Sequence, residues 1–128
     1  MSTVDDVRRI ALALPETTEG TSYGNLAWRV AGKLFAWERP LRRADIAALG
    51  DRVPDGPVYG AWTADEGVKL ALIADDPAVY FTTPHFDGGS AVLFELDRIG
   101  LAELTELLTD AWIARAPGRL AADFISGP

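Results

Sequence analysis

Cysteine is absent from this 128-residue sequence, and histidine occurs only once, at position 85. Without cysteine the chain can form neither a disulfide nor a thiolate metal site, which fits the reducing cytoplasm where we expect the protein. The single histidine, His85, has no second histidine and no close pair of carboxylates at ligand spacing. We therefore predict no metal site and no cofactor.

Long apolar runs and catalytic motifs are missing as well. No stretch approaches the ~20 apolar residues that a membrane-spanning helix needs. The acidic start, residues 1–6, lacks the apolar region of a signal peptide. The sequence contains no Gly-rich phosphate loop, no Gly-x-Ser-x-Gly elbow and no visible pairing of a nucleophile with a base. We expect neither a membrane protein nor an enzyme, and we assign no catalytic residue.

Positive charge is scarce, with 12 basic and 19 acidic residues and a net charge of −7. Such a balance argues against a dedicated nucleic-acid binder, because neutralising phosphates requires cations. The charges are nevertheless unevenly distributed. Residues 28–52 carry six basic and three acidic side chains, whereas residues 60–110 carry two basic and ten acidic ones. A dipolar surface is therefore conceivable.

Apolar periodicity and turn residues predict helices and strands that do not alternate regularly. The predicted helices cover 4–14, 45–49, 66–74, 101–116 and 119–124, and the predicted strands cover 26–30, 33–38, 58–63, 79–83 and 91–96. Residues 16–25 are predicted to be a loop. This order favours an α+β fold, an antiparallel sheet with helices packed on one face. Without repeats or linkers, residues 1–128 form a single domain whose last few residues are a tail.

The predicted hairpin over residues 26–38 is apolar on both sides. Strict alternation places Phe35 and Trp37 on one face and Leu34 and Ala36 on the other. We therefore expect this hairpin to be covered on both sides or to lie close to an interface.

Basic residues around this hairpin give the strongest functional signal. Arginine forks bind phosphate bidentately, and a two-stranded hairpin with basic residues at its tip can act as a wing against nucleic acid. We predict nucleic-acid contacts from Arg29, Lys33, Arg39, Arg42 and Arg43. The alternative is scattered surface charge, paired with Glu38, Asp45 and Asp51.

A second candidate site combines Trp37 with polar residues near position 84. An exposed aromatic beside arginines can stack on a base or a flat ligand. We predict a cleft for a protein or small-molecule partner at Trp37, Tyr80, Thr83 and His85. The alternatives are a core role for Trp37 and a backbone-capping role for His85 in an irregular turn.

Carboxylates also gather in the second half of the chain. Glu103, Glu106 and Asp110 share one predicted helical face, and Asp75-Asp76 ends another helix. A cation-binding ridge is one interpretation of the first group. A solvated polar face and solvated turn residues are the other.

Two sequence blocks resemble the MmcQ/YjbR family of small bacterial proteins: Gly-Lys-Leu-Phe-Ala at 32–36 and Thr-Pro-His-Phe-Asp-Gly at 83–88. With Leu14-Pro15-Glu16 and Ala111-Trp112, the resemblance extends over about residues 4–124. It implies an α+β fold likened to frataxin-type sheets, and a proposed double-wing role in which two hairpins flank DNA.

The resemblance implies no enzymatic activity and supplies no catalytic residue. Gly32 and Lys33 match its hairpin motif, and Pro84, His85 and Phe86 match its second block. The sequence thus predicts a non-catalytic binding module that contacts DNA through a basic hairpin. The alternative is a protein- or small-ligand-interaction module, with no nucleic-acid binding, whose cleft lies near residues 83–88.

Overall fold

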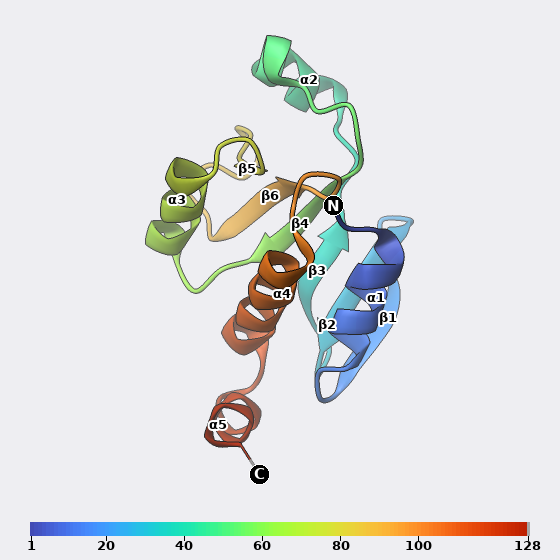
Figure 1. Cartoon of the computed structure of the whole chain (residues 1–128), viewed down its shortest axis with the longest axis vertical. Coiled ribbons are helices and arrows are strands. Elements are labelled where there is room, and N and C mark those ends of the chain that lie inside the picture. Colours follow the sequence, from blue (N-terminus) through green and yellow to red (C-terminus); the bar gives the residue numbers. More distant parts are fainter. Residues whose placement is uncertain (128) are drawn as a thin grey trace.

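One antiparallel sheet in the order β1-β2-β3-β4-β6-β5 forms the frame of the computed structural model, which describes residues 1–127 (Figure 1). Its strands are β1 (Thr17–Ser22), β2 (Asn25–Val30), β3 (Lys33–Glu38), β4 (Val58–Trp62), β5 (Tyr80–Phe81) and β6 (Ala91–Glu95). The helices are α1 (Val4–Leu12), α2 (Arg43–Leu49), α3 (Glu66–Asp75), α4 (Leu101–Arg115) and α5 (Gly118–Ser126), with a 3-10 turn, η1 (Gly50–Arg52), after α2. The predicted α+β class is confirmed.

Helices α1 and α4 cover one face of the sheet and enclose the main core (Figure 1). Trp28 and Phe35 from the sheet meet Leu108 and Trp112 from α4, and all four are fully buried. Burying one such side chain stabilises the fold by about 1.5–3 kcal/mol. The core therefore lies on the helix-covered face.

The start of the chain is fixed against α4 and the turn before it. Thr3 caps α1 and forms a capping box with Asp6. The Ser2 hydroxyl donates to the Ile99 carbonyl at 2.8 Å, and the Trp112 indole N–H donates to the Pro15 carbonyl at 3.0 Å. These contacts hold α1 beside α4.

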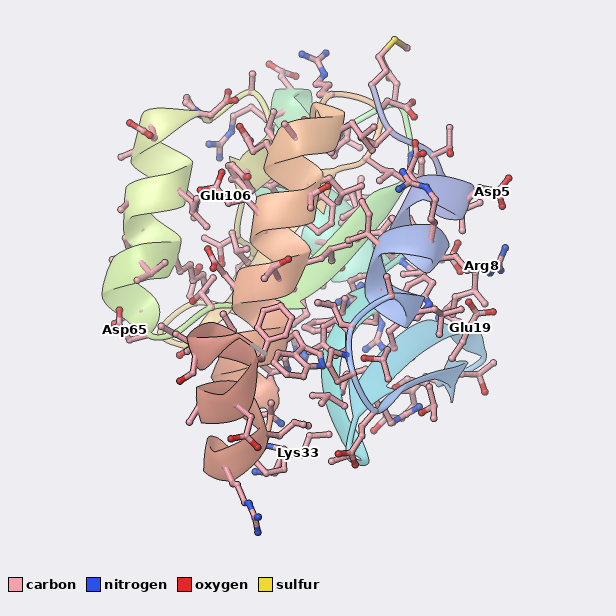
Figure 2. All side chains as sticks on the ribbon, turned by 60° about the horizontal axis from the view of Figure 1, so that its bottom comes forward. Asp5, Arg8, Glu19, Lys33, Asp65 and Glu106 are labelled. Atoms are coloured by element: carbon pink, nitrogen blue, oxygen red, sulfur yellow. The ribbon has the colours of Figure 1, made fainter. Side chains whose placement is uncertain are left out.

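Residues 17–22, predicted to be a loop, form the edge strand β1, so this prediction was wrong. The segment contains no large apolar side chain, and its pairing with β2 supplies the order instead. Glu19 adds a tie, because its Oε1 accepts from the Arg8 guanidinium at 2.7 Å and from the Trp28 indole at 3.0 Å. Figure 2 shows Asp5, Arg8 and Glu19 along one side of the molecule.

Strict alternation in β3 was also wrong, because the strand contains a β-bulge. Trp28 pairs with Ala36 and the next residue of β2 pairs with Leu34, so Phe35 is the extra residue. Phe35 and Ala36 therefore both enter the main core, whereas Trp37 belongs to a second cluster on the opposite face. The bulge thus directs Trp37 away from the helices.

Candidate functional site

The sheet face opposite α1 and α4 contains a pocket of about 380 Å³. We call it the aromatic pocket. The rings that line it are those of Tyr23, Trp37, Trp62, His85 and Phe86. Polar lining comes from Ser22, Asn25, Glu38, Arg39, Arg42, Asp87 and Ser90. A concave site with apolar walls and a few polar groups is typical of small-ligand binding.

Trp37 forms the floor of this pocket because Gly60 leaves room for it. A Cβ at Gly60 would lie 2.6 Å from two carbons of the Trp37 ring. The indole packs at centroid distances of 6.4 Å from Trp62 and 6.3 Å from Phe86. The three rings therefore form one cluster, separate from the main core, on the sheet face opposite α1 and α4 (Figure 1).

The segment 82–90 forms one wall of the pocket and is held by local hydrogen bonds. The Thr83 carbonyl accepts from the backbone N–H groups of Phe86 and Asp87, both at 2.9 Å. The Lys69 ammonium donates to the Phe86 carbonyl from α3. Burial lowers the pKa of Lys69, although Asp87 opposes that shift. Exposed His85 packs edge-on against the Phe86 ring at 4.8 Å.

A buried ion pair fixes the opposite wall. The Arg39 guanidinium lies 3.1 Å from the Asp45 carboxylate, and their side chains are 8% and 4% exposed. Burial opposes ionisation of Asp45, but the Arg42 backbone N–H and the Arg39 charge outweigh it, so the pKa of Asp45 is lowered. Arg39 also lies over the Phe86 ring, 5.2 Å from its centroid. This pair therefore couples α2 to the segment 82–90.

The five predicted nucleic-acid contacts do not form one cluster. Arg39 is buried in its ion pair. Arg29 and exposed Lys33 lie at one end of β3, whereas Arg42 and Arg43 lie beyond its other end, roughly 20 Å along a six-residue strand. Arg29 donates to the Thr21 carbonyl at 3.1 Å. Only Arg39 and Arg42 line the aromatic pocket.

The four predicted ligand contacts divide between the two sheet faces. Trp37 and His85 line the aromatic pocket. Thr83 is 1% exposed, and its hydroxyl faces the Asp45 carboxylate without a hydrogen bond of good geometry. Tyr80 belongs to the main core and donates to Glu103 at 2.8 Å. Burial, followed by that hydrogen bond, raises the pKa of Tyr80.

Sequence reasoning missed Tyr23 and Trp62 as ring residues of the aromatic pocket, and it named Phe86 only as part of the segment 83–88. Tyr23 carried a usable signal, because Tyr23-Gly24 is a two-residue hairpin turn with positive φ at both positions. Tyr23 is 94% exposed, which is unusual for a large aromatic side chain. Trp62 and Phe86 needed the sheet order, since they come from separate segments.

No cluster of three metal-ligating side chains occurs within residues 1–127. In the same residues, no helix combines the length and apolar character needed to cross a bilayer. The lining of the aromatic pocket offers rings, hydroxyls, the Asn25 amide, the carboxylates of Glu38 and Asp87, and the Arg42 guanidinium.

Comparison with known proteins gives a consistent set of matches. A family model described as YjbR matches residues 12–114. Uncharacterized proteins of Mycobacterium bovis and Mycobacterium tuberculosis are 51% identical over 129 residues, which covers 98% of each chain. The crystal structure of a Deinococcus radiodurans protein with a DUF419 domain superposes with a TM-score of 0.66 at 21% identity, covering 88% of this chain and 78% of that one. This structural match bears on the fold alone.

Proposed function

This chain belongs to the YjbR family, and from that premise we propose that it is a non-catalytic binding module for a nucleobase that carries a phosphate. The observation that supports this proposal is the aromatic pocket, whose rings surround a concavity with Arg42 in its lining. Nucleotides and unpaired bases of single-stranded DNA share this chemistry.

Stacking is the main recognition force in this proposal. Each base stacked on an aromatic side chain contributes ~1–3 kcal/mol. Tyr23 and His85 are exposed at the pocket, while Trp37 and Phe86 lie deeper. A flat ring can therefore be held between an exposed aromatic and a fixed one.

The charge of the lining favours a single phosphate over a run of phosphates. Asp45 neutralises Arg39. Glu38 and Asp87 are the two carboxylates of the pocket lining outside an ion pair of the described residues. Arg42 is the lining guanidinium that no ion pair of the described residues neutralises, and we expect it to bind one phosphate, while the two carboxylates disfavour a second. Arg29, on the same face beyond Leu34, could contact the next phosphate of a longer strand.

The test is a titration of the purified protein with thymidine monophosphate, a ten-nucleotide oligo-dT strand and a duplex of equal length. We expect oligo-dT to bind more tightly than the duplex, with a change in tryptophan fluorescence. Tyr23→Ala and Arg42→Ala should each weaken binding about 5- to 150-fold, since each removes about 1–3 kcal/mol of contact.

Arg43→Ala is the matched control, because Arg43 is an exposed neighbour of Arg42 that does not line the pocket. Equal effects of the two arginine variants would contradict the pocket proposal. Tighter binding of the duplex, lost in Lys33→Ala and Arg43→Ala, would instead favour the double-wing interpretation. If none of the probes binds at low salt, both nucleic-acid interpretations, the aromatic pocket and the double wing, are wrong.

A further inference from the structure

A second concavity, the acidic groove, lies between α3 and α4 on the helix-covered side of the sheet. Its volume is about 470 Å³. Val68 and Leu72 of α3 face Leu107 and Ile113 of α4 across it, and Tyr80 lies at its base. Trp62 lines both the acidic groove and the aromatic pocket.

Five carboxylates surround these apolar walls: Asp75, Asp76, Glu103, Glu106 and Asp110. None of them makes an ion pair with another residue of the described chain, 1–127. Among the described residues, no lysine or arginine lines the groove. Figure 2 shows Glu106 in the space between α3 and α4. Like charges around one concavity repel each other, and a bound cation removes that repulsion.

The apolar walls decide what kind of cation fits. Val68 remains 41% exposed although it faces this groove. A hydrated metal ion gains nothing from such walls, and no three carboxylates within residues 1–127 converge tightly enough to ligate one. An organic ammonium ion with an alkyl or aromatic body buries apolar area and places its charge among the carboxylates.

We propose that the acidic groove binds a small amphiphilic organic cation. The apolar body lies between Val68, Leu72 and Leu107, and the ammonium group lies near Glu106 and Asp110. The volume is that of a small-ligand site, about 300–1,000 Å³. The acidic groove is proposed to bind a cation, whereas the aromatic pocket is proposed to bind a nucleobase with a phosphate. The two proposals can therefore be tested independently of each other.

The test titrates the protein with hexyltrimethylammonium and follows backbone amide shifts by NMR. We expect saturable shifts in α3 and α4, and binding at least tenfold tighter than that of tetramethylammonium, since five further methylene groups enter the apolar walls. Hexanol and hexanoate should bind more weakly than the cation. The double variant Glu106→Gln/Asp110→Asn should weaken binding of the cation about tenfold or more, by removing two charges.

Glu66→Gln is the matched control, because Glu66 lies on α3 but does not line the groove. It should leave the affinity unchanged. Val68→Thr should reduce the preference for hexyltrimethylammonium over tetramethylammonium. Equal affinities for those two ions, or shifts spread over every acidic surface, would overturn the proposal. A basic peptide that binds the groove when hexyltrimethylammonium does not would overturn it too.

Discussion

The Lys69 ammonium donates a hydrogen bond to the main-chain carbonyl of Phe86, which lies 17 residues later in the sequence. The lysine is 1% exposed. Through this contact α3 holds the segment whose ring lines the aromatic pocket. The shape of the pocket therefore depends on a side chain that does not line it.

Replacing this lysine should destabilise the fold and change its pH dependence. Lys69→Met removes one of the two hydrogen bonds that the Phe86 carbonyl accepts, the other coming from the Gly89 N–H at 3.2 Å, and a hydrogen bond from a charged donor is worth about 1.5–3 kcal/mol. Burial lowers the pKa of Lys69 in the folded state, below its unfolded value near 10.5. Between these two pKa values the unfolded chain binds more protons, so the wild type gains stability as the pH rises and loses it as the pH falls.

Urea unfolding of both proteins at pH 7 and pH 10 checks this prediction. The stability gap between wild type and Lys69→Met should widen at the higher pH. Lys33→Met, at an exposed turn position, should show no such change. A gap that stays constant for Lys69→Met would contradict the buried-ammonium account.

Removing one partner of the buried Arg39–Asp45 ion pair should strongly lower the free energy of unfolding. Arg39→Met leaves the Asp45 carboxylate buried without its partner, and such a loss costs about 3–5 kcal/mol. Denaturant unfolding measures it, with Arg42→Ala, an exposed change, expected to stay within about 0.5 kcal/mol. The double variant Arg39→Met/Asp45→Asn should recover part of the loss. If Arg39→Met matched Arg42→Ala, the pair would have no structural role.

Filling the space above Gly60 should displace Trp37. In Gly60→Ala the new methyl group would lie 2.6 Å from the indole, and overpacking of this kind costs about 1–3 kcal/mol. The variant should also shift tryptophan emission and reduce the affinity of the aromatic pocket. Gly118→Ala is the control, because no atom lies within 4 Å of a Cβ there. Identical melting temperatures for the two variants would contradict the packing argument.

Replacing Glu19 should lower the stability of the fold, although this residue lies on an edge strand. Glu19→Gln removes the ion pair with Arg8, which we expect to cost about 0.5–1 kcal/mol. The hydrogen bond from Arg8 lowers the pKa of Glu19. Its stabilisation is therefore present above the unfolded pKa and is lost as the pH falls through the folded pKa.

Thermal unfolding between pH 7 and pH 3 measures this effect. The difference between wild type and Glu19→Gln should shrink with acidification. Asp5→Asn serves as a comparison, since the Asp5 side chain is 86% exposed in its contact with Arg8. A difference that is independent of pH would exclude the carboxylate as its cause.

The fold class and most elements could be predicted because their signals are local. Periodicity located α4, and Ala31-Gly32 marked the turn between β2 and β3. The edge strand β1 could not be found, because its order comes from pairing with β2 and not from its own side chains. The bulge at Phe35 was equally hidden, since an extra strand residue has no sequence signal of its own.

The candidate site was predictable only in part for the same reason. Trp37 and His85 were both singled out, and both line the aromatic pocket. For Arg39 the sequence left two interpretations open, a free cation and a cation paired with a carboxylate such as Asp45, and the structure shows the pair. Tyr80 was predicted to line the same cleft, but it lies in the main core. The pairing register of β5 decides which sheet face this side chain is on, and the sequence alone does not give that register.

Two of the hydrogen bonds that fix α1 join residues 97 positions apart, Ser2 with Ile99 and Trp112 with Pro15. During synthesis on a ribosome, α1 emerges long before α4 does. The apolar side of α1 therefore remains without its α4 contacts until α4 has been synthesised, whereas the neighbouring strands β1, β2 and β3 can already pair locally. A chain truncated before residue 101 would therefore keep its first helix undocked, with the apolar side of that helix exposed to water.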